Sequence, residues 1–328
     1  MTSKIRCFLG ALAALLVAAC SGAGSRDSGG GRESIAGDFG HLPVGNSRNV
    51  QIEALDRILS ASQLSAVDRS VYLSIRAYQL SRAGRTADSQ KDVAEMGKVL
   101  PSVWPLVLSS TQPELAGGGD RAAALRTLEF GLQQKPGDPW LMVAQAEVNM
   151  QIADFDRALE LLNGAVASAS SAGERRTAFY YRGQANFNLG NYRQAADDFE
   201  ASLAGRSTPK ARMAPVLWRY AAQVHTPRVD ARAVLAQEVG KEDLDAWPGG
   251  IARFLLGRMT AGELEVMAES DETAKRTNGK CPAAFFIAMD ALRRGDRRRA
   301  REQLQLAQAR CPTVSEINWG ATSELKRL

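Results

Sequence analysis

The stretch that decides the fold is RTAFYYRGQANFNLGNYRQAADDFEASLAGRSTP, residues 176–209. In its second half, large or small apolar residues recur at the spacing of one helix face, at Tyr192, Ala195, Phe199 and Leu203. In its first half, Gly183 is a small residue at which a second helix can approach closely. Leu189 and Gly190 then predict the end of the first helix, because glycine commonly follows a helix C-terminus. The stretch therefore predicts two antiparallel helices joined by a short turn.

The same pattern returns along the chain with a period near 34 residues. Three repeats are clear, at 139–172, 176–209 and 281–314. Two are weaker, at 70–103, where Ser89 and Met96 replace the usual alanines, and at 105–138. In the latter, we expect Pro113 and the glycines at 117–119 to interrupt the first helix. Residues 210–280 are helical in pattern but diverge from the repeat. Each weak unit could equally be a generic helical hairpin.

These units resemble the tetratricopeptide repeat (TPR). The resemblance implies an all-α fold, a TPR-type solenoid of helical hairpins over 49–328. One hairpin cannot bury its apolar face alone, so neighbouring hairpins must stack on each other. Such proteins bind other proteins and seldom catalyse reactions, so we expect no enzyme.

Composition excludes several classes of function. Among 328 residues there are two histidines, His41 and His225, and four cysteines. This scarcity excludes a multi-histidine metal centre and leaves little room for histidine acid–base catalysis. We therefore predict no cofactor, no metal and no catalytic residue. The formal net charge of +5 becomes +3 once Lys4 and Arg6 are removed with the predicted signal, so nucleic acid is not an expected partner.

The N-terminus indicates export. After Lys4 and Arg6 comes an apolar run of thirteen residues, 7–19, which is too short for a membrane span and suits a signal core. The sequence Val-Ala-Ala-Cys at 17–20 resembles a bacterial lipobox, so we expect a cleaved signal at 1–19 and lipid on Cys20. An ordinary signal peptide cut near a cysteine is the alternative. Residues 20–48 are rich in glycine and serine and predict a flexible tether with a span of roughly 30 Å.

The C-terminal half resembles the NlpI-type TPR lipoproteins of proteobacteria. The similarity rests on an aromatic helix at 216–220, a helix opening on Trp247, the last repeat, and a closing Glu-Leu-Lys-Arg-Leu at 324–328. It implies an outer-membrane lipoprotein facing the periplasm. Such a protein acts as an adaptor for peptidoglycan hydrolases in envelope maintenance, and often as a homodimer. Ser21 after the cysteine resembles the outer-membrane sorting class. A pilotin, or an assembly lipoprotein for secretion or polysaccharide export, remains the alternative.

Two cysteines remain after the predicted removal of Cys7 and lipidation of Cys20. Cys281 and Cys311 occupy positions 1 and 31 of the last repeat. The start of the first helix and the end of the second lie side by side in an antiparallel hairpin, within disulfide reach. The periplasm is oxidising, so we predict a Cys281–Cys311 disulfide; two buried free thiols are the alternative.

The repeat resemblance also predicts the partner-binding surface. First-helix positions of the two central repeats should line a concave face, namely Trp140, Val143, Glu147, Met150, Tyr180, Gln184, Phe187 and Asn188. Half of these could instead pack between hairpins. The Lys and Asn pair that clamps a carboxylate in chaperone-binding relatives is absent. Six arginines between Arg293 and Arg301 surround the last turn, either as a solvated surface or as a contact for phosphates or an acidic partner.

Overall fold

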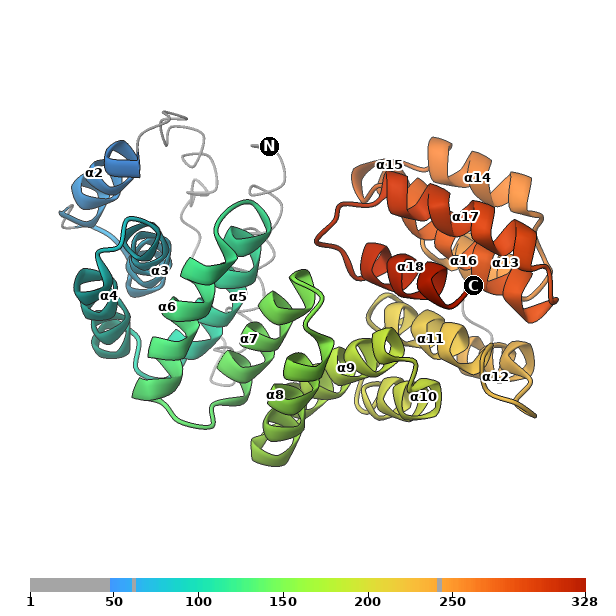
Figure 1. Ribbon diagram of the computed structural model, residues 1–328, viewed down its shortest axis with the longest axis horizontal. Helices are drawn as coiled ribbons and strands as arrows, with labels where there is room; N and C mark the ends of the chain where they lie inside the picture. The colour runs from blue at the N-terminus through green and yellow to red at the C-terminus, as the bar shows by residue number, and fades with distance from the viewer. Residues whose placement is uncertain (1–47, 61–62, 241–243) are drawn as a thin grey trace, which may run out of the picture. The chain divides into compact units, whose positions relative to one another are not determined.

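The computed structural model describes residues 48–60, 63–240 and 244–328 (Figure 1). Within these ranges the chain forms seventeen α-helices and no β-strand, which confirms the all-α prediction. None of the described helices is both long enough and apolar enough to cross a bilayer. The predicted signal at 1–19, Cys20 and residues 21–47 of the predicted tether lie outside the described residues.

The chain divides into two compact units, Met1–Thr111 and Gln112–Leu328. The described part of the first unit contains α2 (Arg48–Ser60), α3 (Ala66–Arg82), α4 (Thr86–Val99) and the start of α5 (Trp104–Gly117). Helix α3 begins at Ser65, whose hydroxyl accepts a hydrogen bond from the Asp68 amide at 3.1 Å. This side-chain cap satisfies one of the amide groups that a helix leaves unpaired at its N-terminus.

An arginine joins three helices of the first unit. The Arg76 guanidinium of α3 donates to Asp92 of α4 at 2.8 Å and to Asp56 of α2 at 2.7 Å. Ser89, which stands where the repeat usually has alanine, is buried, and its hydroxyl donates to the Ala77 carbonyl at 2.8 Å. Met96, the other departure from the repeat pattern, is fully buried. Both departures therefore fill positions inside the α3–α4 hairpin.

In its described residues, the second unit continues from the end of α5 through thirteen further helices. They are α6 (Arg121–Gln134), α7 (Pro139–Gln151), α8 (Phe155–Ser168), α9 (Ala172–Leu189), α10 (Tyr192–Ala201), α11 (Pro209–Gln223), α12 (Ala231–Val239), α13 (Gly249–Leu255), α14 (Ala261–Ser270), α15 (Glu272–Arg276), α16 (Lys280–Arg293), α17 (Arg297–Arg310) and α18 (Glu316–Arg327). The three clear repeats correspond to the pairs α7–α8, α9–α10 and α16–α17, whose members pack directly on each other.

The structure differs from the sequence expectation at Pro113. Helix α5 runs through this proline and ends at Gly117. Proline lacks an amide hydrogen, so the helix gives up one internal hydrogen bond there. The Pro113 carbonyl accepts a hydrogen bond from Gln151 Nε2 of α7 at 2.9 Å. The break comes instead at the glycines, after which Asp120 caps α6 by accepting from the Ala123 amide at 3.0 Å.

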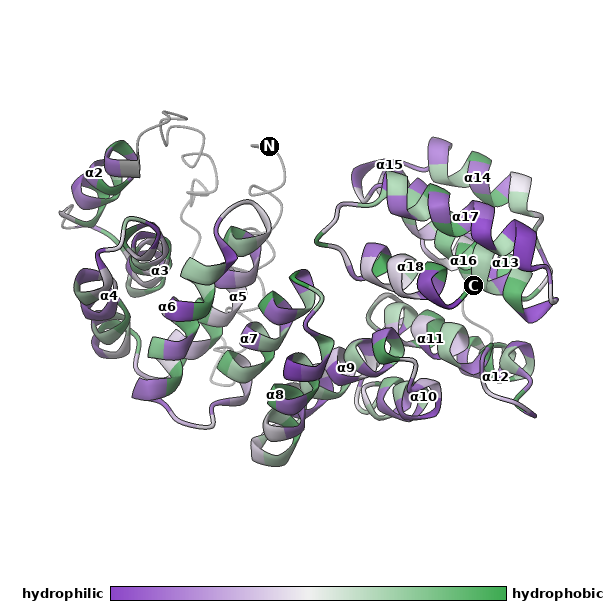
Figure 2. Cartoon of the chain, in the orientation of Figure 1, coloured by the Kyte–Doolittle hydropathy of each residue, from purple (hydrophilic) through white to green (hydrophobic). Residues whose placement is uncertain are grey.

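The hairpin α9–α10 shows why its small residues occupy their positions. A Cβ added to Gly183 would lie 2.8 Å from the Phe199 ring, so only glycine fits this crossing. Gly190 ends α9 in the left-handed conformation, at φ 84°. In α8 and α17 the buried faces are stripes of alanine and leucine, and Figure 2 shows hydrophilic residues covering the rest of α17. Each helix therefore buries one narrow face against its partner.

The centre of the second unit is an aromatic cluster around Trp218 of α11. Its ring centroid lies 5.1 Å from those of Phe187 of α9 and Phe285 of α16, and 6.1 Å from that of Phe199 of α10. A Cβ on Gly320 of α18 would lie 2.9 Å from the Trp218 ring. Five helices from distant parts of the sequence therefore meet at this one side chain.

Cys281 and Cys311 form a disulfide in the structure, with Cα atoms 4.9 Å apart. Both cysteines are buried. The Asn278 side chain also donates to the Arg310 carbonyl at 2.9 Å, next to the disulfide. The bond closes a loop of 30 residues that contains the whole α16–α17 hairpin.

Replacing both cysteines, in Cys281→Ser/Cys311→Ser, should lower the free energy of unfolding by about 3 kcal/mol, because the unfolded chain gains loop entropy. Urea unfolding with and without dithiothreitol measures this. Reductant should destabilise the wild-type chain by a similar amount and leave the variant unchanged. Equal stability of oxidised and reduced wild-type protein would contradict the prediction.

Candidate protein-interaction surfaces

Helix α18 packs against α9, the first helix of the 176–209 repeat, and is held there by a half-buried carboxylate. Glu316 accepts a hydrogen bond from the Tyr180 hydroxyl of α9 at 2.7 Å and from Trp218 Nε1 of α11 at 3.2 Å. Burial raises the pKa of the Glu316 carboxyl, and these two donors oppose the rise. The contact joins residues 136 positions apart in the sequence.

A second carboxylate fixes the other end of α18. Glu324, which is 1% exposed, accepts from the Tyr192 hydroxyl at 2.6 Å and from Arg327 at 3.1 Å, and lies 3.1 Å from His225 Nε2. The Tyr192 and His225 rings stack 3.9 Å apart. Burial alone would raise the pKa of Glu324, but the neighbouring His225 ring, the Tyr192 hydroxyl and the Arg327 guanidinium hold the pKa below its ordinary value.

This packing covers part of the surface that the sequence predicts on α9. Gln184, Phe187 and Asn188 are buried, and Tyr180 is partly buried against Glu316. The Asn188 side chain accepts from the Ser323 hydroxyl of α18 at 2.8 Å, and its carbonyl accepts from Arg327. The expected concave face is therefore occupied, over this repeat, by the chain's own α18. Only Tyr180 of this set keeps part of its side chain accessible.

The expected residues on α7 divide in two. Val143 and Met150 are buried in a cluster with α8 and α9, which Trp319 of α18 also joins. Trp140 and Glu147 are partly exposed. Sequence periodicity could not show this division, because it identifies the positions facing inward but not the distant helix that covers them.

Glu147 lies in a setting that makes its charge sensitive to pH. Burial raises the pKa of its carboxyl to about 7, and the negative charges of Glu114 and Glu316 add to the effect while a hydrogen bond with Tyr181 opposes it. An acid with a raised pKa in the folded state stabilises the fold only while it is protonated. Its contribution is present below pH 4.5 and is lost as the pH rises towards about 7.

The free energy of unfolding of Glu147→Gln should therefore increase relative to that of the wild type as the pH rises from 5 to 8. The difference between the two proteins should change by about 2 kcal/mol over this range. Glutamine keeps the shape and a hydrogen-bonding group for Tyr181 but cannot ionise. Urea unfolding at the two pH values measures the difference. The exposed residue Glu129, changed to Gln, is the control and should show no such trend. A constant offset between wild type and Glu147→Gln would contradict the prediction.

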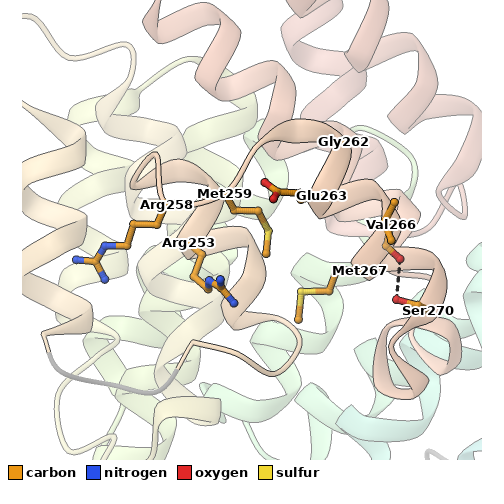
Figure 3. Close-up of a pocket in the computed structure, with 8 residues that line it drawn as sticks. All are labelled: Arg253, Arg258, Met259, Gly262, Glu263, Val266, Met267 and Ser270. Atoms are coloured by element: carbon orange, nitrogen blue, oxygen red, sulfur yellow. Dashed lines mark hydrogen bonds between the residues drawn. The ribbon is translucent and has the colours of Figure 1, made fainter.

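A more accessible site lies between α13 and α14, in the part of the sequence that diverges from the repeat. A pocket of about 520 Å³ is lined by Arg253, Arg258, Met259, Gly262, Glu263, Val266, Met267 and Ser270. Figure 3 shows Met259 and Met267 directed towards the middle of the pocket, while Arg258 extends outwards. Val266 on its rim is 64% exposed, the largest exposure of any large hydrophobic side chain in the described residues.

The chemistry of this pocket suits a protein segment. Methionine side chains are flexible and polarisable, so they adapt to apolar groups of different shapes. Arg253 forms an ion pair with Asp245 at 2.7 Å, and Glu263 is engaged in capping α14 through the Thr260 amide at 2.7 Å. Among the described residues, no three His, Cys, Asp or Glu side chains are placed to hold a metal ion together. The pocket could not be recognised in the sequence, because its residues follow no repeat pattern.

No protein-family model matches the chain, and no curated protein matches it. Solved structures similar to it include a tetratricopeptide repeat protein from Parabacteroides merdae, at 15% identity and a TM-score of 0.44, covering 77% of this chain and 99% of that one. Another is the C-terminal part of a TPR repeat-containing protein from Cytophaga hutchinsonii, at 15% identity and a TM-score of 0.37, covering 83% and 94%. The helical hairpins described above rest on this chain's own small residues, caps and buried stripes.

Proposed function

We propose that this protein is a non-catalytic interaction scaffold, an outer-membrane lipoprotein that faces the periplasm and docks peptidoglycan hydrolases in envelope maintenance. The observation that carries the scaffold role is the α13–α14 pocket, where Val266 and two methionines are accessible on a stack of helical hairpins. The lipobox and the NlpI-type resemblance support the location and the class of partner. A second copy of the chain is a further expected partner on the same resemblance.

The disulfide supports an oxidising compartment, because disulfides persist in the periplasm and are rare in the cytosol. We place the partner surface at the α13–α14 pocket and not on the concave face that the repeats predict. Tyr180 and Asn188 bind α18, and Gln184 and Phe187 are buried, so this face is not open to a partner. The α13–α14 pocket needs no such rearrangement.

Docking through the pocket is tested by Val266→Asp, which places a charge on the exposed apolar rim. We expect capture of peptidoglycan hydrolases from envelope extracts to fall more than about tenfold, since burying an unpaired charge at an interface is costly. Ile152→Asp is the matched control, because Ile152 is also exposed, at 49%, and lies at the α7–α8 turn.

The identity of the captured proteins separates the candidate functions. Equal capture of the hydrolases by both variants would remove the pocket from the proposal. Capture of a secretin or polysaccharide-export subunit in place of hydrolases would support the assembly-lipoprotein alternative. Hydrolysis of purified sacculi by the protein alone would contradict a non-catalytic role.

Lipid anchoring is tested separately with Cys20→Ala, since this substitution removes the thiol that would carry the acyl chains. Metabolic labelling with palmitate should mark the wild-type chain and leave the variant unlabelled. The outer-membrane fraction should lose the variant, because two or three acyl chains anchor a protein strongly. Labelling of Cys20→Ala, or its full retention in the outer membrane, would contradict the lipoprotein assignment.

A further inference from the structure

The turns that follow α9, α11, α13 and α16 lie along one edge of the second unit. Arg232, at the start of α12, donates to the Leu255 carbonyl at the end of α13 at 2.9 Å and lies 3.6 Å from Asp290 near the end of α16. Arg297 and Arg301 of α17 donate to the Leu328 carbonyl at 3.2 and 2.6 Å. Next to it, Arg327 reaches the Asn188 carbonyl at the end of α9. These contacts connect the hairpin ends to one another.

Arginine is concentrated along this edge. Residues 290–302 alone contain six arginines and three acids, and the turns after α11 and α13 add Arg228 and Arg258. Arg298 is 88% exposed, and its nearest carboxylate oxygen, on Glu302, is 3.9 Å away. Within the described residues, the side chains of Arg228, Arg258 and Arg299 form no ion pair, and all three are exposed.

Acidic side chains at the same turns form hydrogen bonds or ion pairs within the protein. Asp230 accepts from the Arg232 and Ala233 amides at 3.0 and 3.1 Å, and Asp296 accepts from the Arg299 amide at 3.0 Å. Asp290, which is 2% exposed, is surrounded by Arg293 and Arg294 at 2.9 and 2.6 Å. Asp230 and Asp296 therefore cap helices and Asp290 lies in the interior, while Glu302 is exposed beside Arg298.

The arginines at the start of α17 oppose the stability of that helix. Arg297, Arg298 and Arg299 are its first three residues, and positive charge is unfavourable at a helix N-terminus. Arg297 has a structural use, since it binds the Leu328 carbonyl. Within the described residues, Arg299 forms no ion pair, and Arg298 forms only a long one, 3.9 Å to Glu302.

We propose that this arginine edge, formed by Arg228, Arg258, Arg298 and Arg299, binds the phosphate groups of an anionic phospholipid surface. A guanidinium group matches phosphate oxygens with two parallel hydrogen bonds. The arginines are spread over several turns instead of converging on a pocket, which suits a surface of many headgroups. Val229, 38% exposed beside Arg228, supplies an apolar contact at the same edge. The inference does not depend on lipid at Cys20.

The test uses the full chain carrying Cys20→Ser, so that no acyl chain contributes, and vesicles of phosphatidylglycerol with phosphatidylcholine. Arg228→Gln/Arg298→Gln/Arg299→Gln should lower the vesicle partition coefficient on the order of 100-fold, at roughly fivefold for each arginine. The matched control Lys275→Gln/Arg276→Gln/Arg310→Gln removes the same charge near the opposite ends of the helices and should retain most binding. Added salt should weaken vesicle binding by the chain that keeps these arginines, because salt screens their charges.

Each other outcome overturns the proposal. Equal loss in both triple variants would show that net charge alone matters. Equal binding of the unsubstituted and edge-substituted chains would show that these arginines do not contribute to vesicle binding. Binding to phosphatidylcholine vesicles at the same strength would exclude phosphate recognition by charge. Binding of an acidic protein or a DNA duplex at this edge, without vesicle binding, would assign it to another class of partner.

Discussion

The packing around Trp218 is the interaction on which the second unit depends. Its ring contacts Phe187, Phe199 and Phe285 from three other helices, and its indole nitrogen donates to Glu316 of α18. A fully buried tryptophan needs a partner for its N–H group, and here that partner is the half-buried carboxylate of Glu316. Helices that are far apart in sequence thereby become neighbours, and Gly320 provides the space for the last of them.

The position of α18 redistributes the surfaces available for binding. A stack of helical hairpins would ordinarily leave its inner face open. Here Glu316 and Glu324 form hydrogen bonds with tyrosines of the central repeat, and Ser323 and Arg327 bind Asn188. The accessible features are consequently at other places, an apolar pocket beside α14 and an arginine-rich edge at the hairpin turns. The two features adjoin at Arg258, which lines the pocket and also belongs to the edge.

Local patterns predicted local structure well. The turn at Gly190 lies where the pattern places it, because a positive φ favours glycine. Cys281 and Cys311 lie next to each other because a hairpin brings its two ends together. Pro113 was the exception. A proline by itself predicts a break in a helix, yet α5 continues through Pro113. The Pro113 carbonyl accepts a hydrogen bond from Gln151 of a neighbouring helix.

The sequence by itself determined the helical periodicity, the small residues at the crossings, the helix ends and the pair of cysteines, because each depends on residues within about one hairpin. Only the tertiary structure decided which inward-facing residues are accessible. That outcome depends on α18, which lies more than 130 residues from the tyrosines it binds. It also placed Arg228, Arg258 and Arg298 on one edge, since their proximity comes from the stacking of hairpins and leaves no periodic signal along the chain.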